Sequence, residues 1–217
     1  DATWSMTKEL PPNSIVIVKH TNPCAAAIPK HETESLESIY RRAHSCDPIS
    51  SFGGIIGIHG EIDNETAKAI KESFYEVIIC KSLSLEARET FKSKKNLRVI
   101  IFPNFKPVTW TAKQLSTGDT LYQESDLENI KVQGLANSLE NLDANFAWTM
   151  VKHVKSNAIV IVKDGRLIGV GPGQTSRVQS CKLAVEAAGE EARGAVAASD
   201  AFFPFPDGVE VLAKAGV

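Results

Sequence analysis

Residues 13–19 read Asn-Ser-Ile-Val-Ile-Val-Lys, and residues 157–163 repeat them as Asn-Ala-Ile-Val-Ile-Val-Lys. Four consecutive apolar residues with branched Cβ atoms are typical of a strand buried on both faces of a sheet. The first copy continues into His20 and the segment TNPC, whereas the second continues into Asp164-Gly165. A repeated strand with different polar residues at its end predicts two copies of one α/β unit. Functional residues are therefore expected just past the two strands.

Strand and helix patterns alternate around the first copy. Helical spacing separates further apolar runs, which predict strands at 52–58, 77–80 and 97–102. This order predicts a mainly parallel sheet with helices on its faces. The pattern then weakens up to residue 133, with a short hairpin expected near residues 120–123. The predicted organisation is a first lobe at 1–105, a connecting segment at 106–138 and a second lobe at 139–217.

The second lobe is predicted to begin with a helix at 139–153. Asp164-Gly165 between two apolar runs is a strong hairpin signal. A helix at 176–192 and a short strand at 195–198 should follow, and Asp207 is a suitable cap for the last helix.

Composition excludes several classes of protein. The chain has 217 residues, 43% of them hydrophobic and 23% charged, which is ordinary for a globular protein. Its net charge of −2 gives no bulk attraction to nucleic acid or to an anionic membrane. No apolar run approaches the roughly 20 residues of a membrane helix. The four cysteines form no CxxC pair, so we expect no cysteine-based zinc site, and free thiols favour a cytoplasmic location.

Lys19 and His20 end the first repeated strand. Histidine is the side chain best suited to moving protons near neutral pH, and an adjacent lysine can hold an anion. Neighbours in a regular strand point to opposite faces, so both serve one site only if the chain bends there. Pro23 is expected to stop the strand ladder and permit that bend. The alternative is a strand-end histidine beside a solvated lysine.

The segment GVGPGQTSR at 169–177 precedes a predicted helix. A dinucleotide-binding loop would need glycine at the position of Gln174, and no P-loop lysine follows. What remains is a glycine turn with exposed amides, which is a natural seat for an anion. Arg177 lies in the first helical turn, where the helix dipole disfavours a cation, so an anion or a partner should compensate it. The alternative is a capping turn with an exposed arginine.

Three further segments are candidates for ligand contact. The loop SDAFFPFPDG at 199–208 has enough aromatic residues to wall a pocket for a flat ring, or to pack as a core loop. The paired glycines at Gly53 allow close approach of a ligand or simply a bend. Glu76 is by default a solvated carboxylate, and Asn157 is suited either to bind a ligand or to cap its own turn.

Six segments occur in one order along the chain: VKHTNPC, DPISSFGG, EVIIC, FAWTMVKHVKSNAIVIVKDG, IGVGPGQTSR and ASDAFFPFPD. This set closely resembles the AICAR transformylase domain of the bifunctional purine-biosynthesis family, and the resemblance spans essentially the whole chain. It implies transfer of a formyl group from 10-formyltetrahydrofolate, the co-substrate, to the 5-amino group of AICAR, which yields FAICAR and tetrahydrofolate. It also implies a fold similar to cytidine deaminases, with duplicated α/β/α lobes and mainly parallel or mixed sheets.

The resemblance also implies roles for individual residues. His20 would transfer the proton, Lys19 would stabilise the transition state, and Asn157 would hydrogen-bond AICAR or the formyl oxygen. The remaining roles are contact with AICAR for Gly53, Glu76, Arg177 and Phe202, and contact with folate for Val178 and Asp207.

The family uses no metal, and its members are homodimers whose active sites are shared between subunits. No cyclohydrolase domain is recognisable in the chain, so we expect an excerpt of a longer protein. Two other functions stay open: a non-catalytic remnant that binds a nucleotide or dimerises, and a hydrolytic nucleobase deaminase, which would require zinc ligands.

Overall fold

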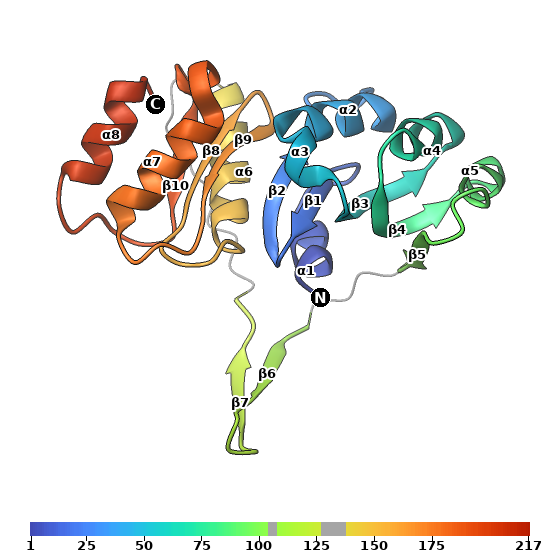
Figure 1. The fold of residues 1–217 in the computed structure, drawn as a ribbon, viewed down its shortest axis with the longest axis horizontal. Helices are drawn as coiled ribbons and strands as arrows, with labels where there is room; N and C mark the ends of the chain where they lie inside the picture. Colours follow the sequence, from blue (N-terminus) through green and yellow to red (C-terminus); the bar gives the residue numbers. More distant parts are fainter. Residues whose placement is uncertain (104–107, 127–137) are drawn as a thin grey trace.

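The computed structural model describes residues 1–103, 108–126 and 138–217 of the chain. Its centre is an eight-stranded sheet with the strand order β10-β8-β9-β2-β1-β3-β4-β5. Figure 1 shows this sheet running through the whole body of the molecule, with a two-stranded hairpin, β6–β7, projecting from it. The sheet therefore joins segments from both predicted lobes.

Within the described ranges there are eight α-helices and a short 3-10 helix. The first part of the chain contains α1 (Ala2–Glu9), β1 (Ile15–Lys19), β2 (Asn22–Ala27), α2 (Leu36–Cys46), α3 (Pro48–Ser51), β3 (Gly54–Ile62), α4 (Asn64–Lys71), β4 (Tyr75–Leu83), α5 (Leu85–Phe91) and β5 (Arg98–Ile101). The hairpin is β6 (Trp110–Gln114) and β7 (Thr120–Glu124), and the rest is α6 (Ser138–Val151), β8 (Ile159–Lys163), β9 (Arg166–Gly171), α7 (Arg177–Ala188), η1 (Gly189–Ala192), β10 (Val196–Ser199) and α8 (Asp207–Ala215).

The polarity of the sheet corrects the prediction of a mainly parallel arrangement. Strands β3, β4 and β5 are parallel to one another, as helical crossovers require. All other neighbours in this sheet are antiparallel. The difference arises at Pro23, which does not stop the ladder but lies within β2, opposite Val18. A tight turn at His20-Thr21 makes β1 and β2 a hairpin, so the sheet is mixed.

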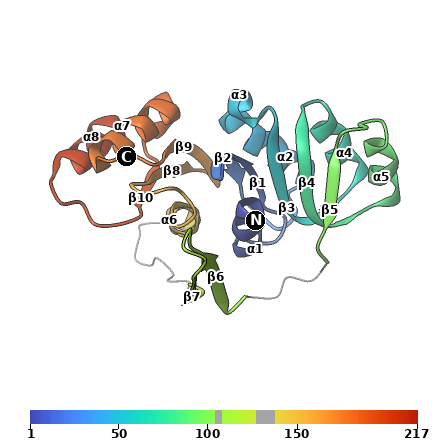
Figure 2. The same cartoon turned by 60° about the horizontal axis from the view of Figure 1, so that its bottom comes forward.

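In both repeated strands the isoleucines face one side of the sheet and the valines face the other. Ile15 and Ile17 pack with α2, α4 and α5, and Ile159 and Ile161 pack with α7 and α8. The alternate residues, Val16, Val18, Val160 and Val162, share one cluster with α1 and α6. Figure 2 shows α1 and α6 on one side of the sheet and the other large helices on the opposite side. Burial on both faces explains why both repeats are continuously apolar.

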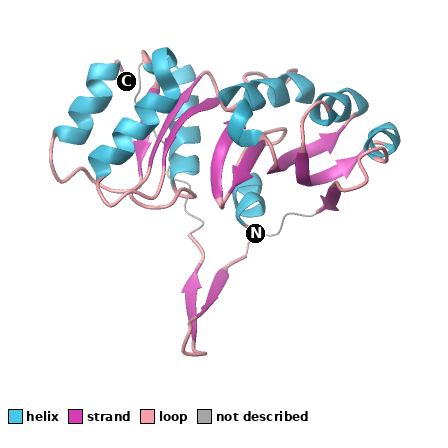
Figure 3. Ribbon diagram, in the orientation of Figure 1, coloured by secondary structure: helices cyan, strands magenta, loops and turns pink. Residues whose placement is uncertain are grey.

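Two sets of elements have the same order and the same pairing. In each, a helix precedes a hairpin, a second helix follows, and a strand then returns antiparallel to the first strand of the hairpin. These sets are α1-β1-β2-α2-α3-β3 and α6-β8-β9-α7-η1-β10, in which α3 and η1 are short. Figure 3 shows them as two neighbouring groups of strands flanked by helices. Their second strands, β2 and β9, meet antiparallel through Ala27 and Arg166.

The side chain of Arg42 in α2 joins the two sets at this meeting point. Its guanidinium donates to the carbonyl oxygens of Ile28, at 3.2 Å, and Asp164, at 2.8 Å. The Glu34 carboxylate accepts from the same guanidinium at 2.7 Å, and both side chains are largely buried. Buried, paired charges of this kind fix geometry because breaking either half leaves the other unpaired.

The expected hairpin near residues 120–123 is confirmed as β6–β7, whose residues are all exposed except for its turn at Leu115. Residues 106–107 and 127–137 of the predicted connecting segment lie outside the described residues, so its boundaries stay a prediction. Among the helices that are described, none combines the length and the apolar character that crossing a membrane requires.

Candidate functional site

The sheet places the predicted residues of both halves on one edge. Strands β1, β9 and β10 end at this edge, whereas β3, β4 and β8 begin there, as their pairing directions require. Residues that follow the first group and precede the second therefore face the same way. These residues are Lys19 at the end of β1 and His20 after it, Arg177 and Val178 after β9, Phe202 and Asp207 after β10, Gly53 before β3, Glu76 at the start of β4, and Asn157 before β8. We call this edge the site edge.

His20 occupies the turn of the first hairpin. Its φ is 51° and that of Thr21 is 65°, so both residues adopt the left-handed conformation of a two-residue hairpin turn. This conformation costs free energy in residues other than glycine, and the cost is largest for a β-branched residue such as threonine. The turn leaves His20 exposed, and among the described residues no hydrogen bond to its imidazole ring is found. The ring is thus free to meet a ligand.

Lys19 points toward the start of β3. Its ammonium donates to the carbonyl oxygen of Phe52 at 2.8 Å. Gly53 follows with a φ of 74°, a conformation that suits glycine, and its N–H donates to Phe74 at 2.9 Å. The bend that the sequence predicts after Lys19 is therefore the turn at His20-Thr21 itself. Glu76 is exposed beside this group.

Asn22 links the first hairpin to the second half. Its side-chain oxygen accepts the backbone N–H of Lys155 at 3.1 Å, and its amide nitrogen donates to the carbonyl of His20 at 3.3 Å. The Lys155 carbonyl in turn accepts from Gly173 at 2.7 Å. Asn157 lies two residues beyond Lys155, so the catalytic candidates from the two halves belong to one hydrogen-bonded region.

Arg177 is held inside the chain. Its Nη1 donates to Ser199 Oγ at 2.8 Å and to the Asp200 carboxylate, and its Nη2 donates to Asn157 Oδ1 at 2.7 Å. The side chain is only 9% exposed. The anion that compensates a cation in this first helical turn is thus Asp200 of the same chain. The alternative of an exposed arginine is wrong.

Two glycines of the segment 169–177, Gly169 and Gly171, have a packing role, and the anion seat at the start of α7 stays a prediction. Gly169 and Gly171 lie in β9, and α7 crosses them closely. A Cβ atom on Gly171 would lie 1.9 Å from the carbonyl oxygen of Ser180, and one on Gly169 would lie 2.2 Å from that of Ala184. Only Gly173 has the positive φ, 67°, of a turn glycine.

A groove of about 370 Å³ opens at the β10 end of the site edge. Its lining includes Asn157, Arg177, Val178, Phe202 and Asp207, five residues that the sequence predicts for the site. Phe202 is 81% exposed, so the alternative of a packed core loop is wrong for this residue. Asp207 begins α8 but does not cap it, because its carboxylate accepts only the next N–H, that of Gly208.

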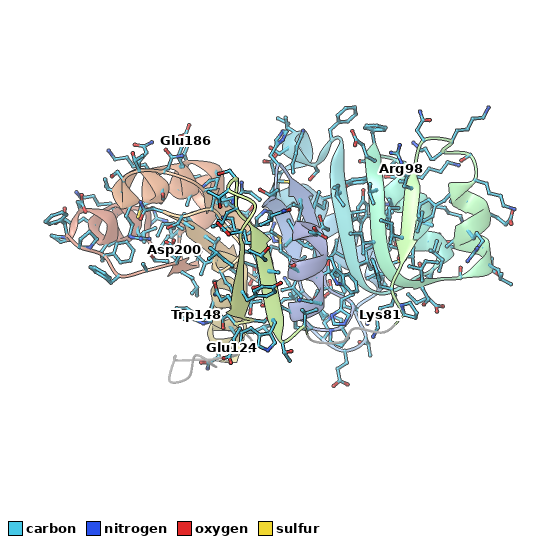
Figure 4. The ribbon with its side chains drawn as sticks, turned by 90° about the horizontal axis from the view of Figure 1, so that it is seen from below. Lys81, Arg98, Glu124, Trp148, Glu186 and Asp200 are labelled. Carbon is cyan, nitrogen blue, oxygen red and sulfur yellow. The ribbon has the colours of Figure 1, made fainter. Side chains whose placement is uncertain are left out.

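The predicted residues are nevertheless spread widely along the site edge. Six strand spacings separate β4, with Glu76, from β10, which precedes Phe202, and this corresponds to roughly 30 Å. Figure 4 shows the two ends of the sheet, with Asp200 near one and Lys81 and Arg98 near the other. One nucleotide cannot span that distance. Glu76 and Phe202 of one chain therefore cannot contact the same nucleotide.

The cysteines offer no activated nucleophile. All four are free, and burial raises the pKa of Cys24 and of Cys46 to about 11. Over the described part of the chain, no three His, Cys, Asp or Glu side chains lie together as metal ligands would.

A family model described as AICARFT/IMPCHase bienzyme matches residues 1–187. The chain belongs to this family. Together with the order of the site residues, the match shows a segment of a purine-biosynthesis protein.

Curated relatives support the same assignment. The chain is 44% identical, over 226 aligned residues, to the Bifunctional purine biosynthesis protein PurH of Bacillus thuringiensis (strain Al Hakam). It is 43% identical over 229 residues to the PurH protein of Desulfitobacterium hafniense. Each alignment covers all of this chain but 43% of the relative, so the chain spans less than half the length of these proteins.

Three residues that connect the predicted ones have no signal in the sequence: Asn22, Ser199 and Asp200. No spacing rule identifies them, because the bonds join positions far apart in the chain. Asp200, for example, accepts the N–H of Ala158, 42 positions away.

Proposed function

We propose that this segment carries the formyl-transfer activity of its family: transfer of the formyl group of 10-formyltetrahydrofolate to the 5-amino group of AICAR. The observation that carries the proposal is the position of His20. It is an exposed imidazole on a strained turn, next to Lys19, and the turn is linked through Asn22 to the region of Asn157. A base and a cation in this arrangement suit attack by a weakly nucleophilic amine.

The roles of the three candidates follow from their chemistry. His20 would accept the proton that the amine loses when it attacks the formyl carbon. Lys19 and the Asn157 amide are donors that would stabilise the negative charge developing on the formyl oxygen. The groove beside Phe202 would receive a flat ring, with Val178 and Asp207 contacting folate and Arg177 contacting AICAR.

The spread of these residues supports a homodimer with shared sites. Because Glu76 and Phe202 lie roughly 30 Å apart along one sheet, a site that uses both is best made from two copies. In the proposed arrangement Gly53 and Glu76 contact AICAR near one copy's His20, and the partner contributes Arg177 and Phe202. The matching element orders of the two halves likewise support a duplicated fold similar to cytidine deaminases. A cytoplasmic location suits the four free thiols.

The test is formyl transfer by this chain with AICAR and 10-formyltetrahydrofolate, followed through the formation of tetrahydrofolate. We expect turnover by the chain, or by a chimera in which it replaces the matching segment of the Bacillus thuringiensis relative. FAICAR given alone tests the cyclohydrolase reaction in parallel. Binding of AICAR without turnover in either protein would favour a non-catalytic remnant, and loss of the chimera's turnover would reject the proposal.

A further inference from the structure

Asp200 lies next to the groove and binds Arg177, one of the residues that line it. Its carboxylate oxygen Oδ1 accepts the N–H of Ala158 at 3.0 Å and a bond from Arg177 Nη1. The side chain is only 15% exposed. The groove is lined by Asn157, Arg177 and Ala201, whereas Asp200 is not part of the lining that the described residues form. Asp200 is therefore placed to act through Arg177 rather than on a ligand.

The charge of Asp200 is well suited to this task. Burial by itself would raise the pKa of its carboxyl group, but hydrogen bonds from Ser156, Arg177 and Ala158 outweigh burial and hold the pKa below its ordinary value. The group is consequently an anion at neutral pH, and it accepts charge-assisted hydrogen bonds, which are the stronger and more directional kind.

Arg177 connects Asp200 to Asn157. Its Nη1 donates to Asp200 and Ser199, and its Nη2 donates to Asn157 Oδ1 at 2.7 Å. A guanidinium is planar, so anchoring one nitrogen sets the direction of the other. The bonds of Nη1 to Asp200 and Ser199 thus fix the position of Nη2, which donates to Asn157.

The orientation of the Asn157 amide is then determined by its partners. Arg177 only donates, so it must face the amide oxygen, and the carbonyl of Gln174 only accepts, so it must face the nitrogen, at 2.8 Å. The oxygen already has one donor, and one of the two N–H groups is occupied as well. A single N–H remains for a ligand, and its partner must be an acceptor such as a carbonyl oxygen.

We propose that Asp200 is a positioning residue that holds Arg177 and, through it, presents one N–H of Asn157 to an oxygen of the substrate. The inference rests on the proposed formyl transfer for the identity of that oxygen, which belongs to the formyl group or to the AICAR carboxamide. The positioning itself depends only on the hydrogen bonds of this chain.

The test compares Asp200→Asn with Asp200→Glu in the active protein, either the chain or the chimera. Asp200→Asn keeps an acceptor for Ala158 but loses the charge that orients Arg177. We expect kcat to fall about 100-fold, because small misplacements of catalytic groups cost that much, with little change in KM for AICAR. Asp200→Glu restores the charge and should recover part of kcat.

The matched control is Glu34→Gln. Glu34 and Arg42 form a pair of similar burial, 7% and 17% exposed, at the opposite edge of the sheet. Its loss should lower stability without lowering kcat. If Asp200→Asn lowers kcat no more than Glu34→Gln does, the proposal is overturned.

A second measurement separates this inference from the proposed function. The side-chain amide of Asn157 and the guanidinium of Arg177 give distinct ¹⁵N signals when they are immobilised. We expect Asp200→Asn to shift the signals of both groups or to average them by motion. Arg177→Lys should change the Asn157 signals in the same way. Unchanged signals would refute the positioning role. If neither the chain nor the chimera transfers formyl groups, the proposed function fails, and these signals alone decide the role of Asp200.

Discussion

Replacing His20 with alanine is expected to lower kcat for formyl transfer about 1000-fold, because a positioned general base contributes between roughly 100- and 10,000-fold. The KM for AICAR should change little, since the imidazole acts on the proton released during attack. The measurement is steady-state kinetics of tetrahydrofolate formation by parent and variant. Equal losses in AICAR binding and in turnover, or a loss in neither, would remove His20 from its assigned role.

The second hairpin supplies a control for the first. His20 and Thr21 have φ values of 51° and 65°, and Asp164 and Gly165 have 52° and 67°. The two turns thus have the same shape, but only the second carries residues that suit it. Strain retained at one of two equivalent turns is typical of a functional site.

Exchanging His20-Thr21 for Asp-Gly should therefore raise the free energy of unfolding by about 1–2 kcal/mol, because glycine relieves the strain of a β-branched residue at positive φ. The same exchange should abolish formyl transfer. Urea unfolding combined with the kinetic assay tests both effects. An exchanged protein that is less stable than the parent would show that the loss of activity reflects damage to the fold, not removal of the base.

The sequence predicts some elements of this fold because their signals are local. Both repeated strands are continuous β-branched runs, and Asp164-Gly165 predicts the hairpin of β8 and β9. Strand β2 has no such signal. It contains Pro23 and a run of small alanines, and its preceding turn lacks the usual asparagine or glycine. The sequence therefore does not predict this hairpin, nor the antiparallel half of the sheet that follows from it.

In the candidate site, too, the sequence predicts one part and not another. The sequence placed residues just past the strand ends, and topology brings those residues to one edge. The connections between them, such as Arg177 with Asp200, depend on three-dimensional contacts between separate loops. The helix dipole predicts that Arg177 needs an anion, and the three-dimensional contacts identify Asp200 of the same chain as that anion.

The glycines of β9 show how one pattern has two physical causes. Glycine permits a tight turn, and it also permits close packing because it has no Cβ. The segment 169–173 before a helix suggested the first cause. In the structure, α7 approaches β9 so closely that a Cβ on Gly171 would overlap the Ser180 carbonyl, at 1.9 Å. The packing of helix on strand is thus the reason for Gly169 and Gly171.

Replacing Gly171 with alanine is therefore expected to lower the free energy of unfolding by at least about 3 kcal/mol, at the upper end of overpacking costs. The obstacle is backbone, since the oxygen, carbon and Cα of Ser180 all lie within 3.0 Å of the added atom. No side chain can move aside, so α7 itself must shift. Urea unfolding followed by far-UV circular dichroism measures the change.

Gly173→Ala is the matched control in the same segment. Its nearest contact would be the Cβ of Lys155 at 3.7 Å, which is ordinary packing, but its φ of 67° is strained for alanine. We expect a loss of about 1–2 kcal/mol from the backbone alone. If the two variants are equally stable, conformational freedom and not close approach explains Gly171. A larger loss for Gly171→Ala, accompanied by loss of the Arg177 contacts that α7 carries, would show that this packing also positions the site.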